Sequence, residues 1–228
     1  MKRIWVVLLI LIVLIGSAIT WFFLGGNRES RIDPKDRAKI TVMPLPANLS
    51  LAKGEFVITS EMGYAFKNKP TERLNKAIKR FFENLQNQTG IDFDFESPKL
   101  LINFEKSSNG YPSMEDDESY SIAINTSKVI LNAKTEIGVL HGLETLLQLV
   151  KKQNRTPIFP ALDIEDTPRY PWRGLMIDVS RHWIPKEIIL RNIDAMAQVK
   201  LNVLHWHLTD YQGFRIESNK FPNLHLMG

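Results

Sequence analysis

The sequence predicts a small α+β domain, with helices on one side of an antiparallel sheet, followed by the first β-α-β of an incomplete (β/α)8 barrel and preceded by an apolar helix. Three observations support this fold class: an apolar run near the start, alternating strand and helix patterns in the middle, and a strand–helix–strand pattern near the end. The expected boundaries are 1–25 for a membrane anchor or signal segment, 26–37 for a linker, 38–167 for the α+β domain and 168–228 for the start of the barrel.

The composition is that of a globular protein and excludes several classes of site. The chain has 228 residues, of which 44% are hydrophobic and 24% charged. The net charge is +4 without a concentrated Lys/Arg stripe, so we expect no nucleic-acid partner. Because the chain has no cysteine, a disulfide framework, a cysteine-ligated metal and a cysteine nucleophile are excluded.

The N-terminal segment predicts a membrane helix. Residues 5–24 form an almost unbroken apolar run, which is the length that spans a bilayer. Lys2 and Arg3 should stay cytoplasmic, so we expect an inner-membrane anchor with the folded part facing the periplasm or exterior. The alternative is a signal peptide cleaved near residues 16–18, which would give a secreted protein. The apolar run continues past that position, which favours the anchor.

The middle of the chain alternates between strand and helix patterns. The polar linker leads into an alternating strand at 49–58. The remaining predicted elements are a helix with one apolar stripe at 71–85, strands at 100–104, 120–124 and 128–133, and a second helix at 135–150. This order predicts helices packed on one side of an antiparallel sheet.

A β-α-β unit follows this domain. Residues 174–179 form a short apolar run, typical of a buried parallel strand. Pro185 then opens a helix, and a second strand begins at Leu201. Five apolar residues form one face of that helix: Ile188, Ile189, Ile193, Met196 and Val199.

Polar side chains follow both strands of this unit. Arg181 and His182 follow the first strand, while His207 and Asp210 follow the second. Catalytic groups of barrels gather at the carboxyl ends of the strands, so these residues are site candidates. The plainer alternative is structural: Asp178 would be a buried partner of a neighbouring donor, and Arg181 would form a salt bridge with Asp178 or Asp210.

The stretch from Arg173 to Ser218 resembles the start of the catalytic barrel of family 20 glycoside hydrolases, the β-N-acetylhexosaminidases. The resemblance rests on Arg-Gly at 173–174, Asp-Val-Ser-Arg-His at 178–182 and His-Trp-His-Leu-Thr-Asp at 205–210. The preceding domain resembles the small non-catalytic domain of that family, so the resemblance covers about residues 38 to 228.

The resemblance implies retaining, substrate-assisted hydrolysis of terminal N-acetylhexosamine from oligosaccharides, without a metal or a cofactor. The 2-acetamido oxygen of the sugar is then the nucleophile. Arg181 would bind hydroxyls of the terminal sugar, and Asp210 would support the catalytic acid through a later histidine. His207 would lie beside that network, as a further substrate-binding residue.

The sequence departs from the family pattern at the acid. In the family, an adjacent Asp-Glu pair after Gly-Gly supplies the acid and steadies the acetamido group. The only Asp-Glu here, Asp117–Glu118, lies in a polar, acidic loop that we interpret as a solvated surface. Because a full barrel needs about 250 residues, we expect this chain to be an inactive N-terminal fragment.

Two other functions fit parts of the pattern. His205 and His207 could bind zinc, together with Asp210, in a metal-dependent hydrolase. Alternatively, the chain could be a membrane-anchored glycan-binding module without catalysis.

Overall fold

The computed structural model describes residues 32–33, 35, 39–106 and 110–227. The predicted anchor at 5–24 and most of the predicted linker lie outside these residues, so the structure does not test either prediction. Within the described part, no helix is both long and apolar enough to cross a bilayer.

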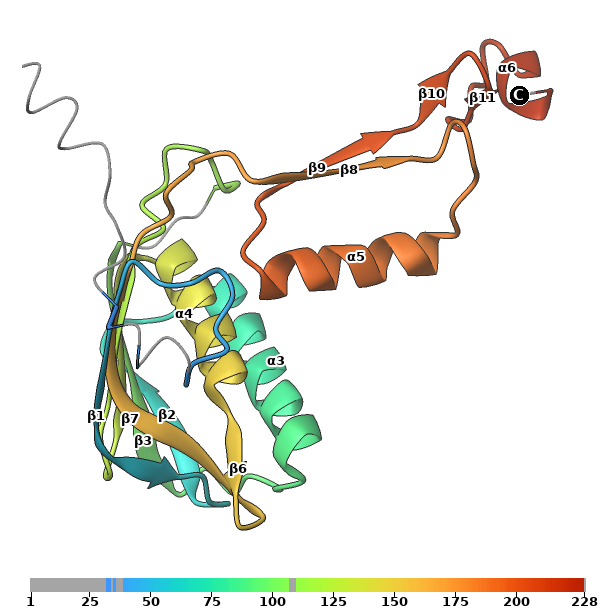
Figure 1. The fold of residues 1–228 in the computed structure, drawn as a ribbon. Helices are drawn as coiled ribbons and strands as arrows, with labels where there is room; N and C mark the ends of the chain where they lie inside the picture. Colours follow the sequence, from blue (N-terminus) through green and yellow to red (C-terminus); the bar gives the residue numbers. More distant parts are fainter. Residues whose placement is uncertain (1–31, 34, 36–38, 107–109, 228) are drawn as a thin grey trace, which may run out of the picture. The chain divides into compact units, whose positions relative to one another are not determined.

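The first domain is a seven-stranded sheet with two helices on one face (Figure 1). The strands follow one another across the sheet in the order β1 (Asn48–Val57), β7 (Thr156–Asp166), β4 (Tyr120–Ile124), β5 (Val129–Thr135), β3 (Ser97–Lys106) and β2 (Met62–Phe66), with β6 (Lys151–Gln153) beside β7. The two helices are α3 (Glu72–Thr89) and α4 (Glu136–Leu149). The predicted placement of the helices on one side agrees with this arrangement.

The sheet is mixed, and the prediction of an antiparallel sheet is wrong in this respect. Strand β3 runs parallel to both β2 and β5, and the other pairs are antiparallel. The parallel pair β2–β3 follows from the crossover through α3, since parallel neighbours need a long connection. The sequence pattern did not identify residues 62–66 as a strand, so the crossover was missed.

The longest strand, β7, was also missed by the pattern. It has 11 residues and lies between β1 and β4. Pro157 and Pro160 interrupt its apolar run, and proline within a run argues against an interior strand because it cannot donate to the ladder. Here Pro160 lies opposite Glu55, at the point where the register of β1 shifts between Leu51 and Glu55. The Ile58 amide donates to the Pro157 carbonyl, so by alternation along β7 the nitrogen of Pro160 lies on the side away from β1. On that side β6 pairs with residues 156–158 and β4 with residues 162–166, so neither of these strands needs a donor from Pro160.

Local capping and close packing hold the two helices on the sheet. Thr71 caps α3 by accepting from the Leu74 amide, and Gly90 ends the helix in a left-handed conformation, with φ of 78°. Gly142 brings α4 close to the sheet, since a Cβ there would lie 2.3 Å from Leu131 Cδ1. The core between helices and sheet is made of buried aliphatic and aromatic residues, among them Leu74, Phe81, Leu100, Leu131, Leu146 and Phe159.

The second part contains the predicted β-α-β unit. Strands β8 (Gly174–Asp178) and β9 (Val203–His207) pair in parallel, and α5 (Lys186–Gln198) connects them. A short hairpin of β10 (Thr209–Asp210) and β11 (Gly213–Phe214) follows, and then α6 (Asn223–Leu226). Only Ile189 and Met196 of α5 are buried, whereas Ile193 on its predicted apolar face is 43% exposed.

An ion-pair network joins the two parts, and it corrects the interpretation of the acidic loop. Glu118, predicted to be solvated, has a side chain only 10% exposed that forms an ion pair with Arg173, just before β8. His141 Nε2 on α4 lies 3.2 Å from the same carboxylate. Burial by itself would raise the pKa of Glu118, but hydrogen bonds and charge from His141 and Arg173 outweigh burial and lower that pKa. A partner 55 residues away is invisible to a local pattern.

A second buried network lies at the end of α5. The side chain of Lys200 is 5% exposed, and its Nζ lies 2.7 Å from Tyr120 Oη and 3.3 Å from Asp166 Oδ2. Tyr120 Oη also donates to Asp166 Oδ2 over 2.7 Å. Lys200 therefore fixes the end of α5 to the end of β7.

Candidate active site

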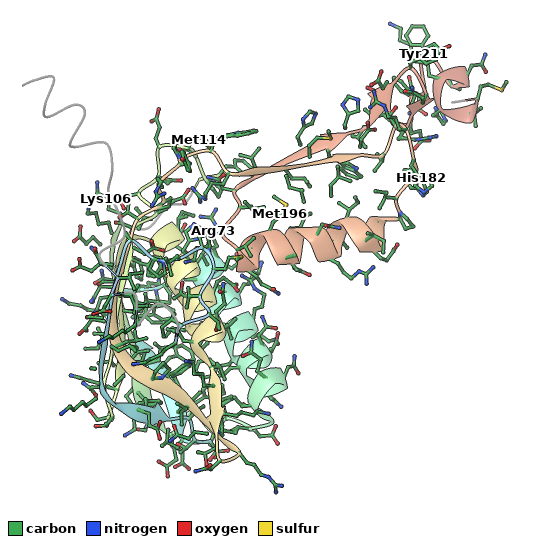
Figure 2. All side chains as sticks on the ribbon, viewed as in Figure 1. Arg73, Lys106, Met114, His182, Met196 and Tyr211 are labelled. Atoms are coloured by element: carbon green, nitrogen blue, oxygen red, sulfur yellow. The ribbon has the colours of Figure 1, made fainter. Side chains whose placement is uncertain are left out.

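The pairing of β8 with β9 brings the site candidates to one end of the β-α-β unit. In the parallel register Asp178 lies opposite His207, so the polar residues that follow each strand meet at the carboxyl edge. The Val179 amide donates to the His207 carbonyl over 3.0 Å and extends the pairing by one residue. Figure 2 shows His182 and Tyr211 at this same end.

Two carboxylates hold the guanidinium of Arg181. Its Nη1 donates to Asp178 Oδ2, and its Nη2 donates to Asp210 Oδ2 over 2.9 Å. Asp178 Oδ1 also accepts from the amides of Ser180 and Arg181, over 3.0 and 3.1 Å. The salt bridges considered from the sequence therefore both exist. The sequence analysis offered these two salt bridges as alternatives, whereas in the structure Arg181 binds Asp178 and Asp210 together.

Asp210 joins the arginine to a histidine. His207 Nε2 lies 3.1 Å from the same Oδ2 atom that accepts from Arg181. The Tyr211 amide donates to the other oxygen, Oδ1, over 2.7 Å. The amide of Tyr211, then His207, and then the positive charge of Arg181 lower the pKa of Asp210, so its carboxylate is ionised at neutral pH.

The arginine keeps hydrogen-bonding capacity for a ligand. A guanidinium has five N–H donors in a planar fork, and the two carboxylates use one donor on each terminal nitrogen. The side chain is 55% exposed, so the remaining donors face solvent. A planar fork of donors matches a pair of neighbouring hydroxyls or a carboxylate.

The β10–β11 hairpin fixes the position of Asp210. Ser180 Oγ donates to the Gly213 carbonyl over 2.9 Å, and Arg215 Nε donates to the Val179 carbonyl over 3.1 Å. A Cβ on Gly213 would lie 2.8 Å from the Ser180 carbonyl oxygen, so only glycine allows this approach. Local sequence patterns do not reveal the contact between Gly213 and Ser180, because it joins residues 33 positions apart.

The described residues around His205 and His207 do not form a ligand set for zinc. The rings of His205 and His207 meet edge to face, with centroids 5.6 Å apart. In the described residues, however, no three His, Cys, Asp or Glu side chains come together in a way that could hold a metal ion. His207 instead shares the Asp210 carboxylate with Arg181.

The Asp-Glu pair lies away from these residues. Glu118 binds Arg173, which directly precedes Gly174, the first residue of β8. Asp178 is the last residue of that strand. Asp117–Glu118 therefore lies at the opposite end of β8 from Arg181, Asp178 and Asp210.

Family models match both parts of the chain. Residues 39–167 match "Glycosyl hydrolase family 20, domain 2", and residues 170–228 match "Glycosyl hydrolase family 20, catalytic domain". A β-hexosaminidase of Vibrio furnissii is 31% identical over 198 residues, which cover 87% of this chain and 31% of that protein. The β-hexosaminidase subunit alpha of Rattus norvegicus is 44% identical over 117 residues, covering 51% of this chain and 22% of that protein.

Solved structures give the same result. A chitobiase of Flavobacterium johnsoniae has a TM-score of 0.77 at 40% identity, over 82% of this chain and 30% of that chain. An exo-β-N-acetylglucosaminidase of Vibrio harveyi, in complex with N-acetylglucosamine, has a TM-score of 0.67 at 30% identity, over 80% of this chain and 28% of that chain. The chain thus spans about a third or less of the length of these four relatives. Because the two family models together match nearly all of residues 39–228, the chain belongs to glycosyl hydrolase family 20.

Proposed function

We propose that these residues belong to a β-N-acetylhexosaminidase, which hydrolyses terminal N-acetylhexosamine from glycans with retention at the anomeric carbon. The observation that carries this proposal is the position of the Arg181 guanidinium at the carboxyl ends of β8 and β9. Asp178 and Asp210 bind it there, and donors remain for a ligand. The β-hexosaminidases among its relatives support the same activity.

In this proposal Arg181 binds hydroxyls of the terminal sugar. Two carboxylates hold its guanidinium, so its position is set before a ligand arrives. Preorganisation of this kind reduces the entropy lost when a ligand binds. His207 lies on the shared carboxylate and would contact the same sugar.

Asp210 is proposed to support the catalytic acid through a later histidine. It is suited to this role because its lowered pKa keeps it ionised and because the Tyr211 amide fixes one of its oxygens. The reaction is substrate-assisted: the acetamido oxygen of the sugar attacks the anomeric carbon while the acid protonates the leaving oxygen. The enzyme therefore needs no nucleophile of its own.

The acid itself is not supplied by residues 1–228. The only Asp-Glu pair in them is Asp117–Glu118, and Glu118 is engaged with Arg173 at the other end of β8. We therefore expect the 228-residue chain to release no chromophore from an aryl β-N-acetylglucosaminide. Turnover that persists after purification to homogeneity would contradict this expectation.

The gene provides the decisive test of the activity. We expect the reading frame to continue past codon 228 and to encode Asp-Glu after Gly-Gly. Its product should hydrolyse the aryl substrate, and Arg181→Ala should abolish most of that hydrolysis. Arg191→Ala, on the exposed surface of α5, is the matched control and should leave it unchanged. Equal activity of the two variants would refute the role of Arg181.

We also propose that residues 5–24 anchor the chain in the inner membrane with the folded part outside the cytoplasm. The support is the apolar run behind Lys2 and Arg3. Membrane fractions should retain the chain after a high-salt wash, and protease added to spheroplasts should digest it. A mature protein that lacks the first residues by mass spectrometry would instead indicate signal cleavage.

A further inference from the structure

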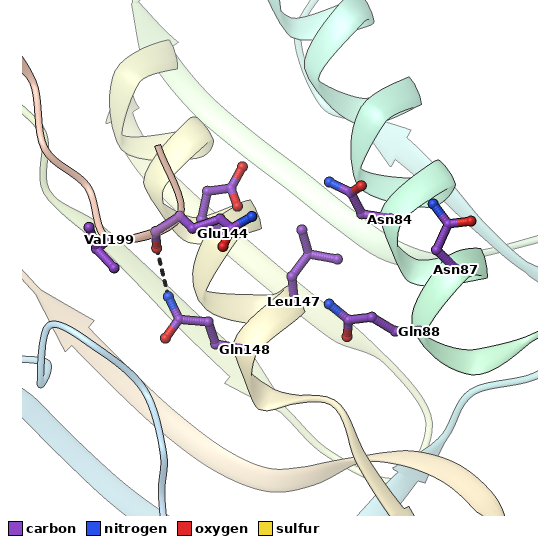
Figure 3. Close-up of a pocket in the computed structure, with 8 residues that line it drawn as sticks. Asn84, Asn87, Gln88, Glu144, Leu147, Gln148 and Val199 are labelled. Carbon is purple, nitrogen blue, oxygen red and sulfur yellow. Dashed lines mark hydrogen bonds between the residues drawn. The ribbon is translucent and has the colours of Figure 1, made fainter. Parts of the chain in front are cut away.

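A hollow of about 300 Å³ lies between α3, α4 and the end of α5 (Figure 3). It shares no residue with the Arg181 site. Its lining is rich in side-chain amides and contains one carboxyl and two aliphatic groups: Asn84, Asn87, Gln88, Glu144, Leu147, Gln148, Gln198 and Val199. Its volume is at the small end of the range for ligand pockets.

Three of the amides are available for a ligand. Asn84, Asn87 and Gln88 are spaced by three and four positions on α3, so they share one face of that helix. Their side chains make no hydrogen bond to another residue in the part of the chain that the structure describes. Figure 3 shows Asn84 and Gln88 extending from α3 toward Leu147 on α4.

Glu144 adds an acceptor on the opposite wall. Its carboxyl is half-buried and has neither a hydrogen bond nor an ion pair among the described residues. Burial raises the pKa of Glu144, and the charges of Arg80, His141 and Lys200 counteract only part of that shift. A half-buried carboxyl without a donor is costly, so a ligand hydroxyl would offer it the partner it lacks.

The third wall is held rigidly in place. Gln148 Oε1 accepts from the Met43 amide over 2.7 Å, while its Nε2 donates to the carbonyls of Met43 and Gln198. These bonds tie the end of α5 to α4 and close one side of the hollow. Leu147 and Val199 provide its apolar surface.

We infer that this hollow is a second carbohydrate site, which binds one neutral saccharide unit apart from Arg181. Carboxamides both donate and accept hydrogen bonds, as sugar hydroxyls do. The lining contains no lysine or arginine, so it does not suit a phosphate or another anion. This inference goes beyond the proposed hydrolysis, because the site would retain a glycan on the domain that precedes the barrel strands.

The test is a titration of the ¹⁵N-labelled 228-residue chain, in a detergent without a sugar headgroup, with N-acetylglucosamine. We expect weak binding, with a Kd on the order of millimolar, as suits a small polar ligand with few contacts. Amide signals of α3 and α4 around Asn84 and Glu144 should shift. Asn84→Ala and Glu144→Ala should each weaken binding about 2- to 10-fold, the effect of losing one hydrogen bond.

Two controls separate this site from the Arg181 site. Asn75→Ala removes the same side chain from the opposite side of α3 and should leave the affinity unchanged. Arg181→Ala should also leave the shifts around α3 and α4 unchanged, whether or not Arg181 binds sugar. The inference is overturned if the sugar shifts no signal of α3 or α4, or if Asn75→Ala weakens binding as much as Asn84→Ala.

Discussion

Replacing Glu118 by glutamine tests how the domain holds the first barrel strand. The Glu118 carboxylate forms an ion pair with Arg173, lies 3.2 Å from His141 Nε2 and accepts from Asn202 Nδ2 over 3.1 Å. The glutamine keeps the size of the side chain but removes the negative charge. Arg173 is then left 13% exposed without a counter-charge.

The expected loss of stability is about 3 kcal/mol. Removing one partner of a buried ion pair costs about 3 to 5 kcal/mol. The lower end applies here because Arg173 still donates to the carbonyls of Tyr170 and Lys200, over 2.7 and 2.8 Å. The loss should lower the free energy that holds β8, α5 and β9 on the first domain, whereas the stability of the first domain's core should be unaffected.

Tryptophan fluorescence during urea unfolding separates these two effects. Trp172, Trp183 and Trp206 all lie in the second part, and residues 39–167 contain no tryptophan. In Glu118→Gln the fluorescence transition should move to lower urea, while the far-UV circular dichroism of the first domain should persist. Glu115→Gln, on an exposed residue of the same loop, is the control. A shift no larger than that of Glu115→Gln would refute the attribution of this attachment to Glu118.

Three further predictions follow from the same contacts. The lowered pKa of Glu118 contributes stability that is fully present above its unfolded pKa near 4.5 and is lost as the pH falls through the folded pKa. The fluorescence transition should therefore move to lower urea in acid, and Glu118→Gln should lack this pH-dependent shift. Gly213→Ala places a Cβ 2.8 Å from the Ser180 carbonyl oxygen and should cost about 1 to 3 kcal/mol in urea unfolding; an unchanged midpoint would show that the hairpin can shift freely. Asp178→Asn removes one of the two carboxylates on Arg181, so the guanidinium ¹⁵N–H signals should exchange faster with water; unchanged exchange would mean that the second carboxylate alone holds the arginine.

Local patterns predicted α3, α4 and the β-α-β unit because these depend on short-range chemistry. The apolar stripe identified the first helix, although its end lies at Thr89, four residues beyond the predicted one. Pro185 gave the start of α5. The convergence of Arg181 and Asp210 followed from strand order alone, since parallel strands present their carboxyl ends together.

Features that depend on distant partners were missed. Strand β7 was missed because of Pro157 and Pro160. Whether a proline is tolerated there depends on how β7 pairs with β1, β4 and β6, which a local pattern does not contain. Glu118 belongs to an acidic run that is typical of a solvated loop, and only Arg173 reveals its buried role. Such pairings are set by tertiary packing and leave no periodicity in the sequence.

The position of β7 has a consequence for the order of events during synthesis. This strand completes the sheet between β1 and β4, and only residues 167–173 separate it from β8. Domains generally fold as they leave the ribosome, N-terminal part first. The first domain can therefore be complete, with Glu118 and Asp166 in place, before α5 emerges. Arg173 would bind Glu118 first, and Lys200 would bind Asp166 later. The apolar surface of β8, α5 and β9 would then pack on a folded first domain as it emerges, and not on another unfolded chain.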